Sequence, residues 1–279
     1  MPPYLLTLPG AVWLALFFVV PLVVMASLST QTGTLEQGFQ QTFHFSNFTD
    51  VLRTYAPQLI RSVEFGSIAT AASLVIAYPM AYWIAFHGGR HKSTFLLLLL
   101  LPFFVSFVIR TLSWQFLLAD QGILFGPLKH IHLIPQNFHV LATSAAVVCG
   151  LTYNFFPFMA LPLYVALERI DRSLIEAAED LYANRTQAFL RVVVPLSMPG
   201  ILAGILLTFI PAAADFVNSS ILGGTGQTMI GNIIQTLFLT NFDYPLASAL
   251  GFVVMIVLLV LMFAYARALG TDEVKEFVS

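Results

Sequence analysis

The sequence has little charge and almost no cysteine. Of its 279 residues only 9% are charged, whereas 58% are hydrophobic, and the formal net charge is −2. This small number of charged side chains cannot cover the surface of a soluble globular protein. The composition therefore predicts a membrane protein. The balanced charge gives no indication of a nucleic-acid partner. The single Cys149 excludes a disulfide within the chain.

Long apolar runs are the main feature that is present. A helix needs about 20 apolar residues to cross a hydrocarbon core of about 30 Å. We therefore expect an all-α, polytopic protein that folds as one domain over residues 1–279, with six transmembrane helices at Leu5–Leu28, Ser62–Phe86, Thr94–Leu118, Val140–Ala166, Ile201–Leu222 and Leu246–Ala268. The first run has no Lys or Arg before it and is longer than the apolar core of a secretory signal, so we interpret it as a span.

Basic residues predict the orientation. If the N-terminus lies inside, the outer segments hold three basic residues and the inner segments hold eight, which agrees with the positive-inside rule. The outer three are Arg53, Arg61 and Lys129, and the inner eight are Arg90, Lys92, Arg169, Arg172, Arg185, Arg191, Arg267 and Lys275. We expect both termini and the polar stretch 168–199 to be cytoplasmic, with the spans in contact with membrane lipid.

The loops carry few signs of chemistry. Residues Phe43–Leu52 predict a short external helix with Ser46 or Asn47 near its cap. The inner loop 87–93 contains two glycines but lacks the spacing of a phosphate-binding loop, so we expect the chain to bind no nucleotide. His130 and His132 lie in an outer loop without further ligands, so no metal site is predicted.

A polar island interrupts the apolar pattern between the fourth and fifth spans. Ser173 and Glu176 have the spacing of a capping box, so a helix should begin there. Glu176, Glu179 and Asp180 would line one face of this helix, and the small or apolar Ala177, Ala178, Leu181 and Ala183 would be offered to a partner. A second helix, Thr186–Val193, should stop before Pro195. Together the two helices predict a stiff elbow joined to the fifth span.

The island resembles the EAA loop of ABC-importer permeases over Glu176–Asn184 and the downstream Arg191–Gly200. This resemblance implies the type I importer permease fold, and a chain that is a transport subunit and not an enzyme. ATP and Mg would be bound by a separate ATPase dimer, and this chain would hold no cofactor. The residues implied to dock on the ATPase are Glu176, Ala177, Ala178, Glu179, Asp180, Leu181, Tyr182, Ala183 and Asn184.

One position departs from the family pattern. Tyr182 stands where the family usually has glycine, and a left-handed backbone there would cost a tyrosine about 1 to 2 kcal/mol. Asn184 tolerates that conformation better. We therefore predict that the turn moves to Asn184, while Tyr182 stays helical and packs against the partner or the neighbouring spans.

Ionisable residues inside the spans are candidates for function because burying a charge in a bilayer is costly. Arg110 and Asp215 are both expected in the outer half of the membrane. Two interpretations remain open: a structural ion pair between them, or a polar lining in which Asp215 meets a cationic substrate. Asn218 shares a helix face with Asp215. Pro211 should interrupt the fifth span just before Asp215, where a broken helix can line a cavity.

Other residues could contribute to this outer mouth. Glu64 would add a carboxylate, although an interfacial acid that faces water is the simpler interpretation. Trp114 and Tyr244 could offer aromatic faces to an ammonium group or could belong to the interfacial aromatic belt. Gly200 and Gly204 suit close helix packing and carry no predicted substrate role.

Further segments resemble the spermidine/putrescine permeases of the PotB type. They are Leu101–Trp114, Asp120–Leu124, Asp215–Gly224 and Met229–Ile234. This resemblance implies a multi-pass permease of the bacterial inner membrane that works with a second homologous permease, an ABC ATPase dimer and an extracytoplasmic polyamine-binding protein. Importers of ferric ion, thiamine or phosphonate share the architecture and remain alternatives, as does an ion-coupled secondary transporter. A membrane enzyme would need a polar constellation within the spans, which the sequence does not supply.

Overall fold

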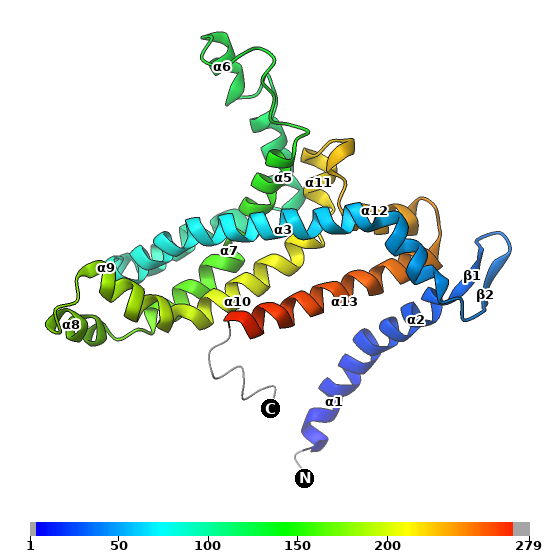
Figure 1. The fold of residues 1–279 in the computed structure, drawn as a ribbon, viewed down its shortest axis with the longest axis horizontal. Helices are drawn as coiled ribbons and strands as arrows, with labels where there is room; N and C mark the ends of the chain where they lie inside the picture. The colour runs from blue at the N-terminus through cyan, green and yellow to red at the C-terminus, as the bar shows by residue number, and fades with distance from the viewer. Residues whose placement is uncertain (1–3, 270–279) are drawn as a thin grey trace. The chain divides into compact units, whose positions relative to one another are not determined.

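The computed structural model describes residues 4–269 and is almost entirely helical (Figure 1). This confirms the all-α fold class. Two short strands, β1 (Gln31–Thr34) and β2 (Gly38–Gln41), form an antiparallel hairpin. The helices are α1 (Tyr4–Leu14), α2 (Val20–Ser29), α3 (Ser46–His87), α4 (Lys92–Leu100), α5 (Phe107–Leu118), α6 (Phe125–His130), α7 (Ser144–Glu168), α8 (Arg172–Asp180), α9 (Arg185–Ala188), α10 (Val194–Ala213), α11 (Val217–Leu222), α12 (Ile230–Leu239) and α13 (Tyr244–Leu269).

The number of spans agrees with the sequence prediction. Within residues 4–269, five helices are long and apolar enough to cross a membrane, and the count reaches six if the bent pair α4–α5 is one span. This pair bends by 89° because Pro102 and an extended Val105 interrupt the helix. The fifth span differs from its predicted bounds. It runs without interruption from Arg185 to Ala213 and ends before Asp215 instead of reaching Leu222.

Two spans pass through a proline directly after a wider helical turn. Residues Ala15–Val19 form a π-turn before Pro21, and Phe189–Val193 form another before Pro195. The wider turn relieves the clash between the proline ring and the carbonyl four residues earlier. The predicted stop before Pro195 is therefore wrong, and α9 continues directly into α10.

The chain divides into two compact units. This division does not test the prediction of a single domain. The first unit comprises Met1–Leu59 and Ile230–Val257. Its hairpin is fastened to the start of α3 by Asn47, whose Nδ2 donates to the carbonyls of Ser29 and Gln31 at 3.0 Å each. The predicted short helix near Phe43–Leu52 is the beginning of the 42-residue α3, which starts at Ser46.

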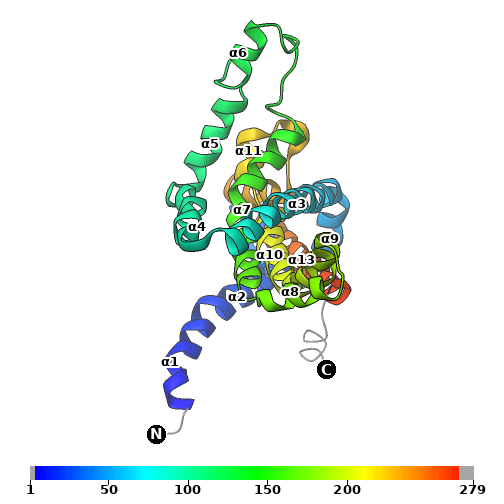
Figure 2. The ribbon, with the colours of Figure 1, turned by 90° about the vertical axis from the view of Figure 1, so that its left-hand side faces the viewer.

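The second unit comprises Ile60–Met229 and Leu258–Ser279, and its centre is the pair α7 and α10. These helices lie side by side in both ribbon views (Figures 1 and 2). Close approach requires glycine on α10. A Cβ at Gly200 would overlap Ala166, and one at Gly204 would lie 2.7 Å from the Sδ of Met159. The expected packing role of these two glycines is thereby confirmed.

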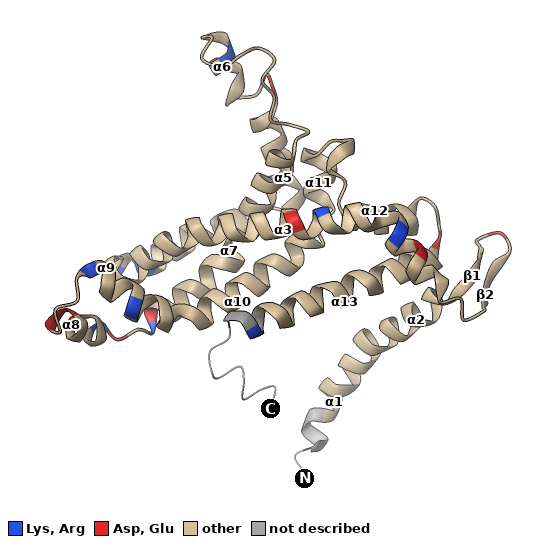
Figure 3. Cartoon of the chain, in the orientation of Figure 1, with Lys and Arg blue, Asp and Glu red and all other residues tan. Residues whose placement is uncertain are grey.

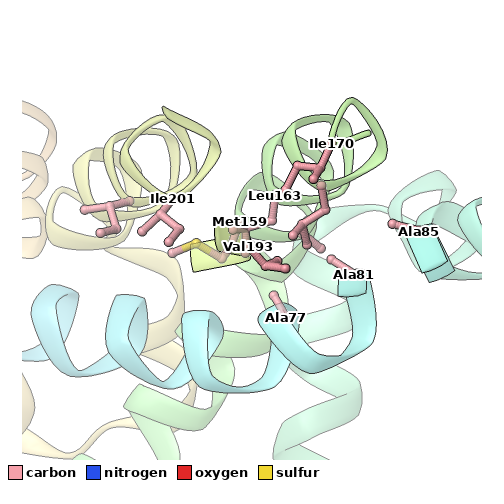
Figure 4. Close-up of a cluster of buried hydrophobic side chains, with 11 residues drawn as sticks. Ala77, Ala81, Ala85, Met159, Leu163, Ile170, Val193 and Ile201 are labelled. Carbon is pink, nitrogen blue, oxygen red and sulfur yellow. The ribbon is translucent and has the colours of Figure 1, made fainter. Parts of the chain in front are cut away.

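A buried apolar cluster joins α3 to this pair. Figure 4 shows Ala77 and Ala81 of α3 pointing toward Met159, Leu163 and Val193. Small side chains at four-residue spacing let α3 approach closely.

Charged side chains within the second unit gather around α8 and α9, whereas α10 carries none and α7 carries only Glu168 (Figure 3). This end of the unit therefore presents its main polar surface. Lys275 and both chain ends lie outside the described residues, and the predicted cytoplasmic location of the termini stays a prediction.

Candidate functional site

The polar island folds as an elbow, defined here as residues Arg172–Val193. Its first helix, α8, is capped two residues earlier than predicted. Asp171 is the cap, and its Oδ1 accepts the Ser173 N–H at 3.0 Å. Asp171 is at least as good a capping residue as Ser173, so the predicted capping box of Ser173 and Glu176 does not form. The Ser173 N–H lowers the pKa of the Asp171 carboxyl from its ordinary value because it stabilises the ionised form.

The turn between α8 and α9 overturns the prediction for Tyr182. Tyr182 has a left-handed backbone with φ of 64°, and the N–H groups of Tyr182 and Ala183 bond to the carbonyls of Glu179 and Ala178 at 3.0 Å. This is a Schellman motif, which normally uses glycine at the position of Tyr182. Asn184 has an extended backbone instead, with φ of −73° and ψ of 164°.

Asn184 is held by the next helix, which explains why the turn does not move there. Its Oδ1 accepts the Gln187 N–H at 2.8 Å, and its own N–H donates to the Gln187 Oε1 at 3.0 Å. This reciprocal capping box satisfies two helix-start donors that would otherwise lack partners. Since Asn184 caps α9, the left-handed turn remains at Tyr182 despite the strain.

The elbow has one anchored face and one exposed face. Ile175 and Phe189 pack on the apolar cluster of the second unit. The predicted acidic residues Glu176, Glu179 and Asp180 are exposed, as is Ala177, while Ala178 and Ala183 are half-buried. At the turn, Leu181 is 81% exposed and Tyr182 is 98% exposed. Tyr182 therefore does not pack against neighbouring spans, and the turn presents two large apolar side chains at its tip.

Arg110 and Asp215 are both buried, but no ion pair joins them in the described part of the chain. The structural ion pair considered from the sequence is therefore wrong. The Arg110 guanidinium instead lies 4.6 Å from the ring centre of Phe103 and 5.7 Å from that of Phe107, a cation–π arrangement. Its Nε has no hydrogen-bond partner. Arg110 is thus a buried cation that packs against aromatic rings and forms no ion pair with an acid among the described residues.

Asp215 lies where α10 gives way to α11, as the position of Pro211 indicated. The helix ends at Ala213, and the Oδ1 of Asp215 accepts the Asn218 N–H at 2.7 Å at the start of α11. The carboxylate therefore holds the break between the two helices through this bond.

A buried hydrogen-bonded cluster holds the side chain of Asn218. The Nδ2 of Asn154, on α7, donates to the Oδ1 of Asn218 and to the Oγ1 of Thr111, both at 2.9 Å. Thr111 also lies 3.4 Å from the Asn218 Oδ1. Gly150 leaves room for this approach, because a Cβ there would lie 2.7 Å from the same oxygen. We call Thr111, Asn154 and Asn218 the polar pin, since it joins α5, α7 and α11.

Asn154 was missed from the sequence. The signal that could have identified it is an amide side chain within the apolar run Val140–Ala166, since polar groups in a span need partners. Asn154 is 1% exposed and Asn218 is 0% exposed. The Asn154 Oδ1 and Asn218 Nδ2 remain without partners, so the pin is only partly satisfied.

The other candidates that the sequence offered are Glu64, Trp114 and Tyr244. Glu64 is exposed on α3, in accordance with the simpler interpretation of an acid that faces water. Trp114 is half-buried and its ring packs edge-on against Tyr153 at 5.4 Å. Tyr244 belongs to the first unit, where its ring lies 4.9 Å from Phe238 and 5.4 Å from Phe39.

The described residues contain no cluster of three or more His, Cys, Asp or Glu that could hold a metal ion. The polar groups that the spans do contain suit binding and helix positioning. These groups are a capped helix break, an amide cluster and a buried guanidinium.

Comparison with known proteins places the chain in a family. Residues 4–271 match the model described as binding-protein-dependent transport system inner membrane component. The chain is 35% identical over 257 residues to the spermidine/putrescine transport system permease protein PotB of Escherichia coli (strain K12), covering 92% of this chain and 94% of that one. It is 36% identical over 259 residues to PotB of Haemophilus influenzae, covering 92% and 90%.

Two solved structures share the fold. A bacterial ABC transporter that imports the acidic polysaccharide alginate superposes with a TM-score of 0.73 at 20% identity, over 95% of this chain and 94% of that one. The MetNI methionine ABC transporter superposes with a TM-score of 0.60 at 16% identity, over 79% and 96%. The predicted importer permease fold is confirmed. This chain belongs to the family of inner-membrane components of binding-protein-dependent transport systems, and it is a multi-pass transport subunit of the inner membrane.

Proposed function

We propose that this chain is the permease subunit of an ATP-driven importer that takes up polyamines such as spermidine and putrescine. The observation that carries the proposal is identity of 35% and 36%, over 92% of the chain, to two permeases named for these solutes. Similarity of this extent covers both the elbow and the helix break at Asp215. Ferric ion, thiamine and phosphonate remain the alternative solutes for a permease of this architecture.

The elbow is the proposed docking site for a separate ABC ATPase dimer, which would bind the ATP and Mg. Its exposed residues include the acidic Glu176, Glu179 and Asp180 and the apolar tip of Leu181 and Tyr182. A complementary partner would offer an apolar pocket with a basic rim. The elbow is short, capped at both helix starts and continuous with α10, so it would transmit a displacement into the membrane. No cofactor is proposed for this chain.

Two further partners complete the proposed assembly. A second homologous permease would supply the other half of the translocation path, and an extracytoplasmic binding protein would deliver the polyamine. In this chain the proposed path residue is Asp215, a buried carboxylate that lies at the helix break and accepts the Asn218 N–H. Asn218 holds that carboxylate, while Glu64, Arg110, Trp114 and Tyr244 are secondary candidates.

Uptake of labelled putrescine and spermidine by the complete complex in proteoliposomes tests the proposal. Asp215→Asn keeps an oxygen that can accept the Asn218 N–H but loses the charge, so uptake should fall while the complex assembles normally. Asp50→Asn, at an exposed acid on α3, is the matched control and should transport normally. Loss of assembly in Asp215→Asn would instead assign Asp215 a structural role.

Two further arms separate the alternatives. Glu176→Ala should weaken ATPase binding and reduce uptake per ATP hydrolysed, and normal coupling in this variant would count against the docking role. Uptake of thiamine, phosphonate or ferric ion with none of either polyamine would overturn the substrate class. Solute movement down an ion gradient without any ATPase would indicate a secondary transporter.

A further inference from the structure

Two polar contacts fasten the junction of α7 and α8, where the elbow begins, to the end of α3 and the start of α4. The Nζ of Lys92, the first residue of α4, lies 2.8 Å from both carboxylate oxygens of Glu168, the last residue of α7. The Nη2 of Arg172, the first residue of α8, donates to the Phe86 carbonyl at 2.6 Å. The Arg172 guanidinium also lies 5.9 Å from the centre of the Phe86 ring. We call Lys92, Glu168 and Arg172 the clamp.

The far end of the elbow is also attached to α3. The Phe189 ring packs edge-on against Tyr78 at 5.7 Å and against Tyr82 at 5.6 Å. The Tyr78 hydroxyl lies 2.9 Å from the Oγ of Ser197 on α10. The elbow is therefore attached to the inner end of α3 at both of its ends, in addition to its covalent continuity with α7 and α10.

The two kinds of contact differ mechanically. Apolar attraction has no preferred direction, so it does not by itself fix the distance between two particular groups. Bonds to both oxygens of a carboxylate and to a backbone carbonyl have a defined direction and length, so they resist displacement along the surface. The side chains of Lys92 and Glu168 are 24% and 38% exposed, and an ion pair this exposed to water contributes little to stability. Stability alone does not account for the clamp.

We propose that the clamp residues Lys92, Glu168 and Arg172 are positioning residues that carry displacement of the elbow into α3 and α4. This inference rests on the proposed function, in which an ATPase moves the elbow. Without the clamp, the elbow would move α7 and α10 directly but would slide along the inner ends of α3 and α4. Hydrolysis would then continue with less solute moved per ATP.

The experiment measures labelled putrescine uptake per ATP hydrolysed by the complete complex in proteoliposomes. Lys92→Gln and Glu168→Gln should each lower this ratio by about 2- to 5-fold, the range that an exposed ion pair can supply. Both variants should keep the thermal unfolding midpoint and the amount of bound ATPase of the wild type. The charge-exchanged double variant Lys92→Glu with Glu168→Lys should restore most of the ratio. Arg90→Gln, an exposed cation in the same turn, is the matched control and should behave as wild type.

The outcomes distinguish failure of the clamp from failure of the proposed function. An unchanged ratio in both single variants overturns the clamp, as does a double variant that is no better than the single ones. A wild-type complex that hydrolyses ATP without moving putrescine would instead refute the proposed function. Loss of the ATPase from Lys92→Gln would also overturn the clamp, because it would place Lys92 in docking and not in transmission.

Discussion

Replacing Asn154 by leucine should lower the free energy of unfolding by about 1 kcal/mol. Leucine has a similar size but cannot donate, so the bonds from the Asn154 Nδ2 to Thr111 and Asn218 are both lost. Hydrogen bonds between membrane helices contribute about 0.6 kcal/mol on average and at most about 1.7 kcal/mol. Two such bonds give about 1 kcal/mol, with an upper limit of about 3 kcal/mol.

The rest of the environment keeps this loss near the lower value. The Asn154 Oδ1 accepts no hydrogen bond, so removing it deprives no donor of its partner. The Thr111 hydroxyl keeps the Phe107 carbonyl at 3.1 Å, and the Asn218 Oδ1 keeps Thr111 at 3.4 Å. Asn154 is 1% exposed, so no solvent can replace the lost donor. The loss therefore does not fall to zero.

Equilibrium unfolding of the purified protein in mixed micelles measures the effect. A cycle of Asn154→Leu, Thr111→Val and the double variant isolates the contribution of the pair, and we expect a coupling of about 0.5 to 1 kcal/mol. Strictly additive single effects, or an Asn154→Leu variant as stable as wild type, would refute the hydrogen-bonded pin.

Three further predictions concern other elements. Tyr182→Gly should remove about 1 to 2 kcal/mol of left-handed strain and cost about 0.5 to 1 kcal/mol through the greater freedom of the unfolded chain. Amide exchange in the elbow should therefore slow. Tyr182→Ala should bring no such gain, because alanine keeps the Cβ that causes the strain. Gly200→Ala should destabilise the protein by about 1 to 3 kcal/mol, because its Cβ would overlap Ala166. Gly10→Ala is the control and should not destabilise it, because a Cβ there meets nothing within 4 Å. Equal thermal unfolding midpoints for the two variants would contradict the packing of α7 on α10. Arg110→Met should cost far less than the about 3 to 5 kcal/mol of breaking a buried ion pair, and a loss of that size in unfolding experiments would indicate an acidic partner.

Signals that depend on neighbouring residues in the chain gave correct predictions. The apolar runs predicted the spans, because the length needed to cross a bilayer is a local property. The capped polar island predicted the elbow, and Pro211 predicted the helix break before Asp215. Gly200 and Gly204 predicted close packing, because only a missing Cβ allows backbones to approach so closely.

Competition between neighbouring signals was harder to resolve from the sequence. Asp171 and Ser173 can both cap a helix, and Asn184 can either close one helix or begin the next. The choice depends on where α8 and α9 meet the apolar cluster through Ile175 and Phe189. The consequence is a tyrosine in a left-handed turn, which local preference alone argues against.

The sequence by itself determined that this chain crosses a membrane about six times and carries a polar elbow between its fourth and fifth spans. Only the tertiary structure decided which polar groups meet: Asn154 with Thr111 and Asn218, Lys92 with Glu168, and Arg110 with aromatic rings in place of Asp215. The physical reason is range. Hydrophobic length and helix caps act over a few residues, whereas these partners are 43 to 76 positions apart, except for the rings beside Arg110, and meet only when the helices pack.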